Sequence, residues 1–168
     1  LDKAARMLTG GGYPGGPIIE KLALSGDSSL YTIPIPMLKS GDLNFSYSGI
    51  KTALLNLLKK IPEKEKEENL QNIAATFQKA VFDSLERKLV KAIVQHDVRH
   101  ILVGGGVSAN KTLRKRFRKL AREKGLTVLF PPVRPLEGDN GAMIGIAAYF
   151  AWKDGRIVET KDFDDLRR

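Results

Sequence analysis

The chain has 168 residues, of which 42% are hydrophobic and 28% charged, so its length and composition fit one globular domain or one lobe of a larger protein. It contains no cysteine, which excludes disulfides and thiolate metal sites and favours a reducing compartment. No apolar run approaches the roughly 18 residues that span a bilayer, and no signal sequence opens the chain. We expect a protein of the cytoplasm without membrane contact, with the mitochondrial matrix as the alternative. The net charge of +9 favours acidic partners such as nucleic acid, although membrane surfaces and simple solubility also fit it.

The first residues already have helical spacing, without an initiating methionine or an N-cap, which indicates a chain cut inside a helix that runs to about Leu8. A cluster of glycine and proline at 10–17 breaks this helix, and Pro17 suits the first position of the next one. Turn formers then alternate with short apolar stretches between Gly26 and Phe45. This pattern, with two prolines in it, predicts extended chain or edge strands.

Two amphipathic helices follow. Apolar residues at helical spacing predict one helix over 50–61, ending before Pro62. A continuous apolar stripe predicts a second, much longer helix over 70–93.

The pattern over 101–130 is typical of a crossover between parallel strands. A strand at 101–103, three glycines, a basic helix from about 109 to 124 and a strand at 128–130 follow one another. The apolar run at 142–152 predicts a buried helix. With no internal repeat and no linker, the sequence predicts a single α/β lobe over residues 1–168.

The glycine-rich segment 104–110 stands where a strand feeds a helix, so its backbone amides could approach an anion or a nucleobase. Its spacing matches neither the dinucleotide fingerprint nor the phosphate-binding P-loop. A tight turn with Asn110 as the helix cap explains the segment equally well.

Other polar residues also have two interpretations. Asp139 is either the N-cap of the last helix or a metal ligand. His96 and His100 are four residues apart, but one ends a helix and the other opens a strand, so we expect a solvent-facing or structural role for both. The basic helix holds eight Lys and Arg against one Glu, which suits either a solvated face or contact with phosphates.

Six blocks of the sequence, in this order and spacing, resemble the C-terminal part of the tRNA N6-adenosine threonylcarbamoyltransferase family, formerly described as O-sialoglycoprotein endopeptidases. The blocks are residues 1–6, 13–17, 45–53, 77–81, 105–110 and 139–144. The resemblance implies one lobe of the two-lobed actin-like and sugar-kinase fold, which is ribonuclease H-like. It also implies an acyltransferase that moves threonylcarbamoyl from threonylcarbamoyl-AMP to N6 of the adenosine 3′ of the anticodon in tRNA.

The resemblance also implies functional roles for particular residues of this chain. Asp139 resembles a metal-ligating aspartate, and the implied metal is one divalent ion, Fe(2+), with its other ligands outside this chain. Asn110 and the amides near Gly105 resemble the adenylate-contacting block. Further positions match nucleotide or ribose contacts: Asp2, Gly16 and Glu20.

The family's His-x-x-x-His metal motif has no counterpart in these 168 residues. We therefore expect an incomplete, inactive C-terminal fragment of an enzyme that binds tRNA, an adenine nucleotide and the partner subunits of its complex. Two alternatives remain open: a lobe of a sugar-kinase-like phosphotransferase, and a non-catalytic interaction lobe.

Overall fold

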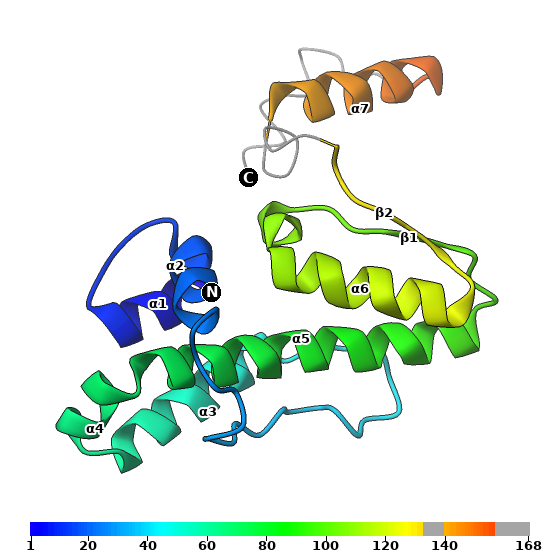
Figure 1. Ribbon diagram of the computed structural model, residues 1–168. Helices are drawn as coiled ribbons and strands as arrows, with labels where there is room; N and C mark the ends of the chain where they lie inside the picture. The colour runs from blue at the N-terminus through cyan, green and yellow to red at the C-terminus, as the bar shows by residue number, and fades with distance from the viewer. Residues whose placement is uncertain (133–139, 157–168) are drawn as a thin grey trace. The chain divides into compact units, whose positions relative to one another are not determined.

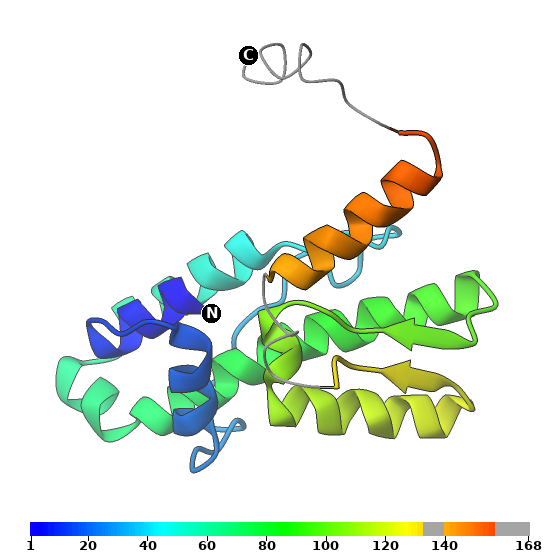
Figure 2. The same ribbon diagram turned by 90° about the horizontal axis from the view of Figure 1, so that it is seen from above.

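The computed structural model describes residues 1–132 and 140–156, which are mostly helical with one small parallel sheet (Figures 1 and 2). The chain divides into two compact units, one of residues 1–102 with 110–129 and one of residues 103–109 with 130–168. The two strands of the sheet are only three residues long each, so nearly all the regular structure of the described residues is helical. The α/β expectation is thus confirmed only in its coarse form, as helices with a small parallel sheet.

The first unit contains every predicted helix up to residue 124. Its helices are α1 (Asp2–Thr9), α2 (Gly15–Ala23), α3 (Tyr47–Lys60), α4 (Glu63–Glu68), α5 (Leu70–Gln95) and α6 (Lys111–Lys124). Ser46 caps α3 by accepting a hydrogen bond from the Gly49 N–H. Helix α5 ends at Gln95, so His96 and His100 are separated by a turn, and both are exposed as predicted.

Helix α5 is the centre of this unit, and α2, α3 and α4 all pack against it. The apolar stripes predicted from the sequence supply the core, and its largest fully buried apolar side chains are Ile19, Ile50, Leu54, Ile73 and Phe82. The chain leaving α2 approaches α5 so closely that a Cβ at Gly26 would lie 2.0 Å from the Gln71 carbonyl oxygen. Only glycine fits at this position, because any side chain would collide with the α5 backbone.

The predicted crossover is confirmed. Strands β1 (His100–Leu102) and β2 (Thr127–Leu129) pair in parallel, with Ile101 opposite Val128, and α6 lies between them in the sequence. Figure 2 shows the two strands side by side. Gly125, in the left-handed region at φ 67°, ends α6 and turns the chain into β2.

An ion cluster ties α6 to α5. The Arg116 guanidinium donates to Glu86 Oε2 at 2.7 Å and to Asp83 Oδ1 at 2.6 Å, and Lys79 Nζ lies 2.6 Å from Asp83 Oδ2. Burial acts to raise the pKa of Asp83, but the hydrogen bonds from Lys79 and Arg116 outweigh it, so the pKa lies below its ordinary value. The Lys79–Asp83 pair has the local i, i+4 spacing of a helix, but no local pattern predicts the contacts of Arg116.

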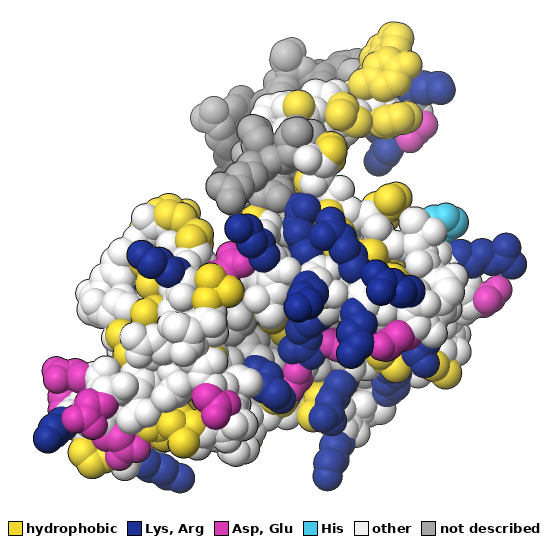
Figure 3. Space-filling view, in the orientation of Figure 1, with side chains coloured by type: hydrophobic (Ala, Val, Ile, Leu, Met, Phe, Trp, Pro, Cys, Tyr) yellow, Lys and Arg dark blue, Asp and Glu magenta, His cyan; other side chains and the backbone are white. Residues whose placement is uncertain are grey.

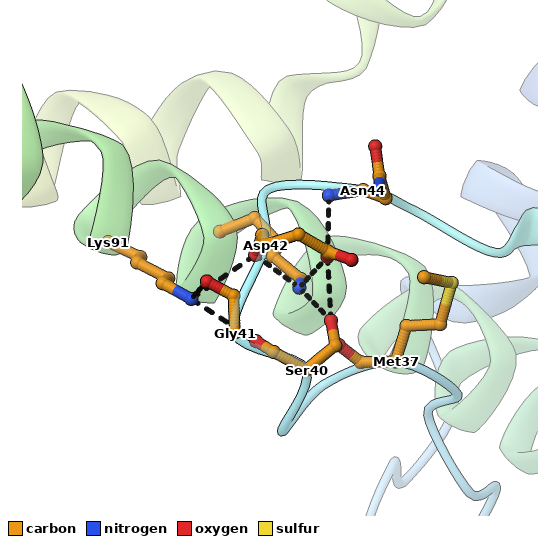
Figure 4. Close-up of polar contacts among 7 residues, drawn as sticks. Met37, Ser40, Gly41, Asp42, Asn44 and Lys91 are labelled. Carbon is orange, nitrogen blue, oxygen red and sulfur yellow. Dashed lines mark hydrogen bonds and ion pairs between the residues drawn. The ribbon is translucent and has the colours of Figure 1, made fainter.

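Residues 26–45 form turns, bends and irregular chain without a strand, so the edge-strand alternative for this segment was wrong. At residues 40–42 lysines of α5 take the place of a neighbouring strand. Lys91 Nζ donates to the carbonyl oxygens of Ser40, Gly41 and Asp42, as Figure 4 shows. Backbone acceptors that a strand partner would bind are bound here by an ammonium group.

A second lysine completes this attachment. Lys88 is buried, and its Nζ donates to Ser40 Oγ at 2.7 Å and to the Asp42 carbonyl at 2.8 Å. Asp42 Oδ1 also accepts hydrogen bonds from the Ser40 hydroxyl and the Asn44 N–H, and these bonds hold the pKa of Asp42 well below its ordinary value. We call Lys88, Lys91 and residues 40–42 the lysine latch.

The second unit contains the short 3-10 helix η1 (Gly106–Ala109) and helix α7 (Gly141–Lys153). Helix α7 forms where predicted, but the expectation that it is buried was wrong, because none of its residues is buried. Within this unit the only other described element is η1, which is too short to cover an apolar helix. None of the described helices is both long and apolar enough to span a bilayer.

Candidate nucleotide-binding site

The N-terminus of α2 lies against α1, and Asp2 joins the two helices. Asp2 Oδ1 accepts a hydrogen bond of 2.7 Å from the Gly15 N–H, where the positive end of the α2 dipole favours a carboxylate. A Cβ at Gly15 would lie only 2.6 Å from the Asp2 Cα, so a side chain at 15 would separate the helices. At Gly16 the nearest atom would be 3.6 Å away, and packing does not demand glycine there.

Glu20 joins α2 to the start of α6. Its Oε1 accepts a hydrogen bond of 2.7 Å from the Lys111 N–H, one of the backbone donors that α6 cannot satisfy within itself. Among the described residues, the second oxygen of Glu20 and that of Asp2 accept no hydrogen bond. Each carboxylate therefore keeps an acceptor of the kind that binds a ribose hydroxyl.

Asn110 is buried at 5% exposure and uses both ends of its side chain. Its Oδ1 accepts from the Leu113 N–H at 3.0 Å, which confirms the helix-cap interpretation. Its Nδ2 donates to Gln78 Oε1 at 3.0 Å, and this contact to α5 has no local sequence signal because the two residues are 32 apart. One N–H of the Asn110 amide remains for a ligand.

Gly105 belongs to the second unit and has a conformation that favours glycine, with φ at +83° and no atom within 4 Å of the position that a Cβ would take. Its carbonyl accepts a hydrogen bond of 2.9 Å from the Ser108 N–H, which starts η1. Asp139 lies outside the described residues. The helix-cap alternative for it was wrong, because the N-cap of α7 is Asn140, which accepts from the Met143 N–H at 3.0 Å.

A groove of about 510 Å³ opens beside this site in the first unit. It is bordered by the end of α2, the middle of α5 and the first turns of α6, and Gln78, the partner of Asn110, is part of its wall. Its lining combines polar residues, among them Gln78, Thr112 and Arg116, with the apolar Leu24 and Phe82.

Three of the expected site residues thus belong to one hydrogen-bonded series within the first unit. Asp2 binds the start of α2, Glu20 reaches from α2 to the start of α6, and Asn110 connects that start to α5. The two carboxylates already occupy the Gly15 and Lys111 amides, so what they offer a ligand is acceptors for ribose hydroxyls. Neither Gln78 nor the Lys111 amide was predicted as part of the site: Gln78 lies in the family block 77–81 but had no binding role assigned to it, and a backbone amide has no signal of its own in the sequence.

The described residues do not form a metal site, because no group of three or more His, Asp or Glu side chains lies together in residues 1–132 and 140–156. His96 and His100 belong to no such group. What the described part of the chain offers a ligand at this site is therefore carboxylate oxygens and the Asn110 amide.

Comparison with known proteins identifies the family of this chain. The family profile described as TsaD, tRNA N6-adenosine threonylcarbamoyltransferase, matches residues 1–146. The chain belongs to this family, and all the described site residues lie within the matched range.

Individual relatives of the chain carry the same name as the family. The chain is 44% identical over 159 residues to the tRNA N6-adenosine threonylcarbamoyltransferase of Clostridium beijerinckii, covering 94% of this chain and 46% of that protein. It is 43% identical to the enzyme of Desulfitobacterium hafniense (92% and 45%) and 44% identical to that of Thermosipho africanus (92% and 46%). The chain spans about half the length of the curated relatives it matches.

Proposed function

We propose that the protein to which this chain belongs transfers threonylcarbamoyl from threonylcarbamoyl-AMP to N6 of the adenosine 3′ of the anticodon in tRNA. The observation that carries this proposal is the match to the family over residues 1–146. Relatives that are 43–44% identical over about nine tenths of the chain and bear the enzyme's name support it further. The transfer activity, the tRNA substrate and a location in the cytoplasm are all parts of this proposal.

In this proposal the chain supplies residues that hold the adenylate. Asn110 contacts the nucleotide through its remaining amide N–H, and Asp2 and Glu20 accept hydrogen bonds from ribose hydroxyls. Gly16 lets the ligand approach the backbone, and Gly105 is assigned the same role on its family motif. Holding the donor adenylate in one orientation converts attack by the tRNA adenosine into a reaction within a complex, which is a large part of what a transferase contributes.

The remaining assignments are also proposals. We assign the whole protein to the actin-like and sugar-kinase fold with this chain as one lobe, and we expect partner subunits in its complex. Asp139 is the proposed ligand of a divalent iron whose chemistry would be Lewis-acid polarisation of the donor carbonyl.

A test in cells separates this function from its alternatives. The gene of the complete protein is expressed in a bacterial strain whose own threonylcarbamoyltransferase can be depleted, and tRNA nucleosides are analysed by mass spectrometry. We expect the threonylcarbamoyl-adenosine peak to persist during depletion. Its disappearance, with the protein folded and abundant, would favour the sugar-kinase-like or the non-catalytic alternative.

A further inference from the structure

Helix α6 is the most basic helix among the described residues and has a high net positive charge. Its 14 residues hold eight Lys and Arg against one Glu, a net charge of +7 out of the chain's +9. The face of α6 that is buried is apolar and consists of Leu113, Phe117, Leu120 and Ala121. Figure 3 shows Lys and Arg side chains gathered over this helix, which Figure 1 labels.

Not every basic residue of α6 is available to a partner. Arg116 is engaged with Asp83 and Glu86 of α5. By contrast Lys111, Lys115 and Arg122 are exposed and have no side-chain ion pair among the described residues. Lys119 is 77% exposed, and its Nζ is 3.8 Å from Glu123, a loose surface pair that contributes little.

These exposed residues form a row along one face. Positions 111, 115, 119 and 122 recur at the spacing that brings side chains onto one side of a helix. Each step of four residues advances about 6 Å along the axis, so the cations are spread over several turns of a rigid rod. A row of this kind matches a linear polyanion better than a single carboxylate or phosphate.

The packing of α6 decides between the two common polyanions, an acidic membrane and a nucleic acid. A basic amphipathic helix binds a membrane by inserting its apolar face among the lipids. The apolar face of α6 is occupied inside the first unit, so only its charged face is free. Nucleic acid needs no insertion, because Lys and Arg bind its phosphates at the surface.

We propose that the exposed row Lys111, Lys115, Lys119 and Arg122 binds the phosphate backbone of RNA, and that this RNA is the tRNA substrate. The identity of the RNA rests on the proposed function. The row begins at Lys111, whose N–H binds Glu20, so it starts at the candidate nucleotide-binding site. Backbone binding here positions the tRNA beside that site without reading its sequence.

The test uses a variant with three neutralised residues, Lys115→Gln, Lys119→Gln and Arg122→Gln, which leaves the candidate site intact. Binding of an unmodified tRNA transcript is measured by fluorescence anisotropy at several salt concentrations. We expect affinity at low salt to fall by about tenfold or more, and the slope of log K against log salt to shrink by roughly 2 units, at about 0.7–0.9 per lost phosphate contact.

A matched control neutralises three exposed lysines elsewhere, Lys59, Lys60 and Lys64 of α3 and α4, with the same change in net charge. We expect this control to keep the salt slope of the unchanged protein. Equal losses in both variants would show a general charge effect and overturn the proposal, as would an unchanged slope in the α6 variant. Circular dichroism establishes that both variants are folded.

Two further measurements distinguish the possible failures. If the α6 variant loses binding to phosphatidylserine vesicles while its tRNA binding is unchanged, the row is a membrane surface and the proposal is wrong. If the complete enzyme transfers nothing to tRNA, but tRNA binding still depends on α6, the proposed function fails and the RNA-binding row stands.

Discussion

Asn110 illustrates at the scale of one residue how a structural role and a binding role share a side chain. Its carbonyl oxygen caps α6, and its amide nitrogen binds Gln78, which is itself buried at 6% exposure. The cap was predictable from the position of Asn110 before the basic helix. The contact with Gln78 was not, because it depends on how α5 and α6 pack.

Replacing Asn110 with Ala should lower the free energy of unfolding by about 1–3 kcal/mol, because α6 loses its cap and Gln78 loses a buried partner. In the complete enzyme, the same change should weaken adenylate binding by about 1–3 kcal/mol if the amide contacts the nucleotide. Urea denaturation measures the first effect, and calorimetry with the adenine nucleotide measures the second. Asn110→Asp serves as the control, because it keeps the oxygen that caps α6 but lacks the amide N–H that binds Gln78.

An Asn110→Ala enzyme that is destabilised but binds the nucleotide with unchanged affinity would contradict the binding role. It would leave the residue with the cap alone.

Lys88 is the most buried charged side chain of the lysine latch, with 4% of its side chain exposed. Replacing it with Met keeps the aliphatic stem but leaves the Asp42 carbonyl and Ser40 hydroxyl without their donor. We expect a loss of about 1–3 kcal/mol in the free energy of unfolding, measured by urea denaturation. Lys59→Met, on an exposed position of α3, should change it by less than about 0.5 kcal/mol. Equal effects of the two substitutions would show that the latch contributes nothing.

At the scale of the elements, local patterns predicted what local forces determine. The helices α3 and α5 follow from their apolar spacing, and the crossover over 100–129 follows from two short strands around a long helix. The segment 26–45 could not be predicted because its partners are distant in the sequence: Asn72 binds Asp27 from 45 residues away, and Lys88 and Lys91 bind residues 40–42 from 46 to 51 residues away. No pattern within that segment shows such partners.

The α5–α6 ion cluster makes stability depend on pH. The folded-state pKa of Asp83 is lowered, so its contribution is present above the unfolded value and is lost as pH falls through the folded value. The window therefore lies below about pH 4, the ordinary range of an Asp carboxyl. We expect Asp83→Asn to be less stable than the unchanged protein at pH 6, with the difference shrinking towards pH 2.

Thermal denaturation at a series of pH values measures this dependence. A difference between the two proteins that stays constant from pH 6 to pH 2 would show that the Asp83 charge does not bind α6.

At the scale of the whole molecule, the sequence identified the family well but did not predict correctly whether every helix is buried. Helix α7 shows the limit. Its apolar residues predicted burial, yet Ile144, Ile146 and Trp152 are each at least 60% exposed. A helix that is apolar on all sides is normally covered by other parts of a protein, but its own sequence does not say which parts cover it. Asp139, the proposed metal ligand, lies outside the described residues, and its role stays a prediction.

The central proposal is that this chain holds the adenylate in a threonylcarbamoyl transfer to tRNA. The most direct measurement supplies the complete enzyme and its partner subunits with threonylcarbamoyl-AMP labelled in threonine, and counts the label on an unmodified tRNA transcript. We predict label on the adenosine 3′ of the anticodon, reduced about fivefold or more by Asn110→Ala at subsaturating threonylcarbamoyl-AMP, in line with the expected loss of adenylate binding. Absence of label on tRNA with the folded, unchanged enzyme, or label that is insensitive to removal of that adenosine, would contradict it.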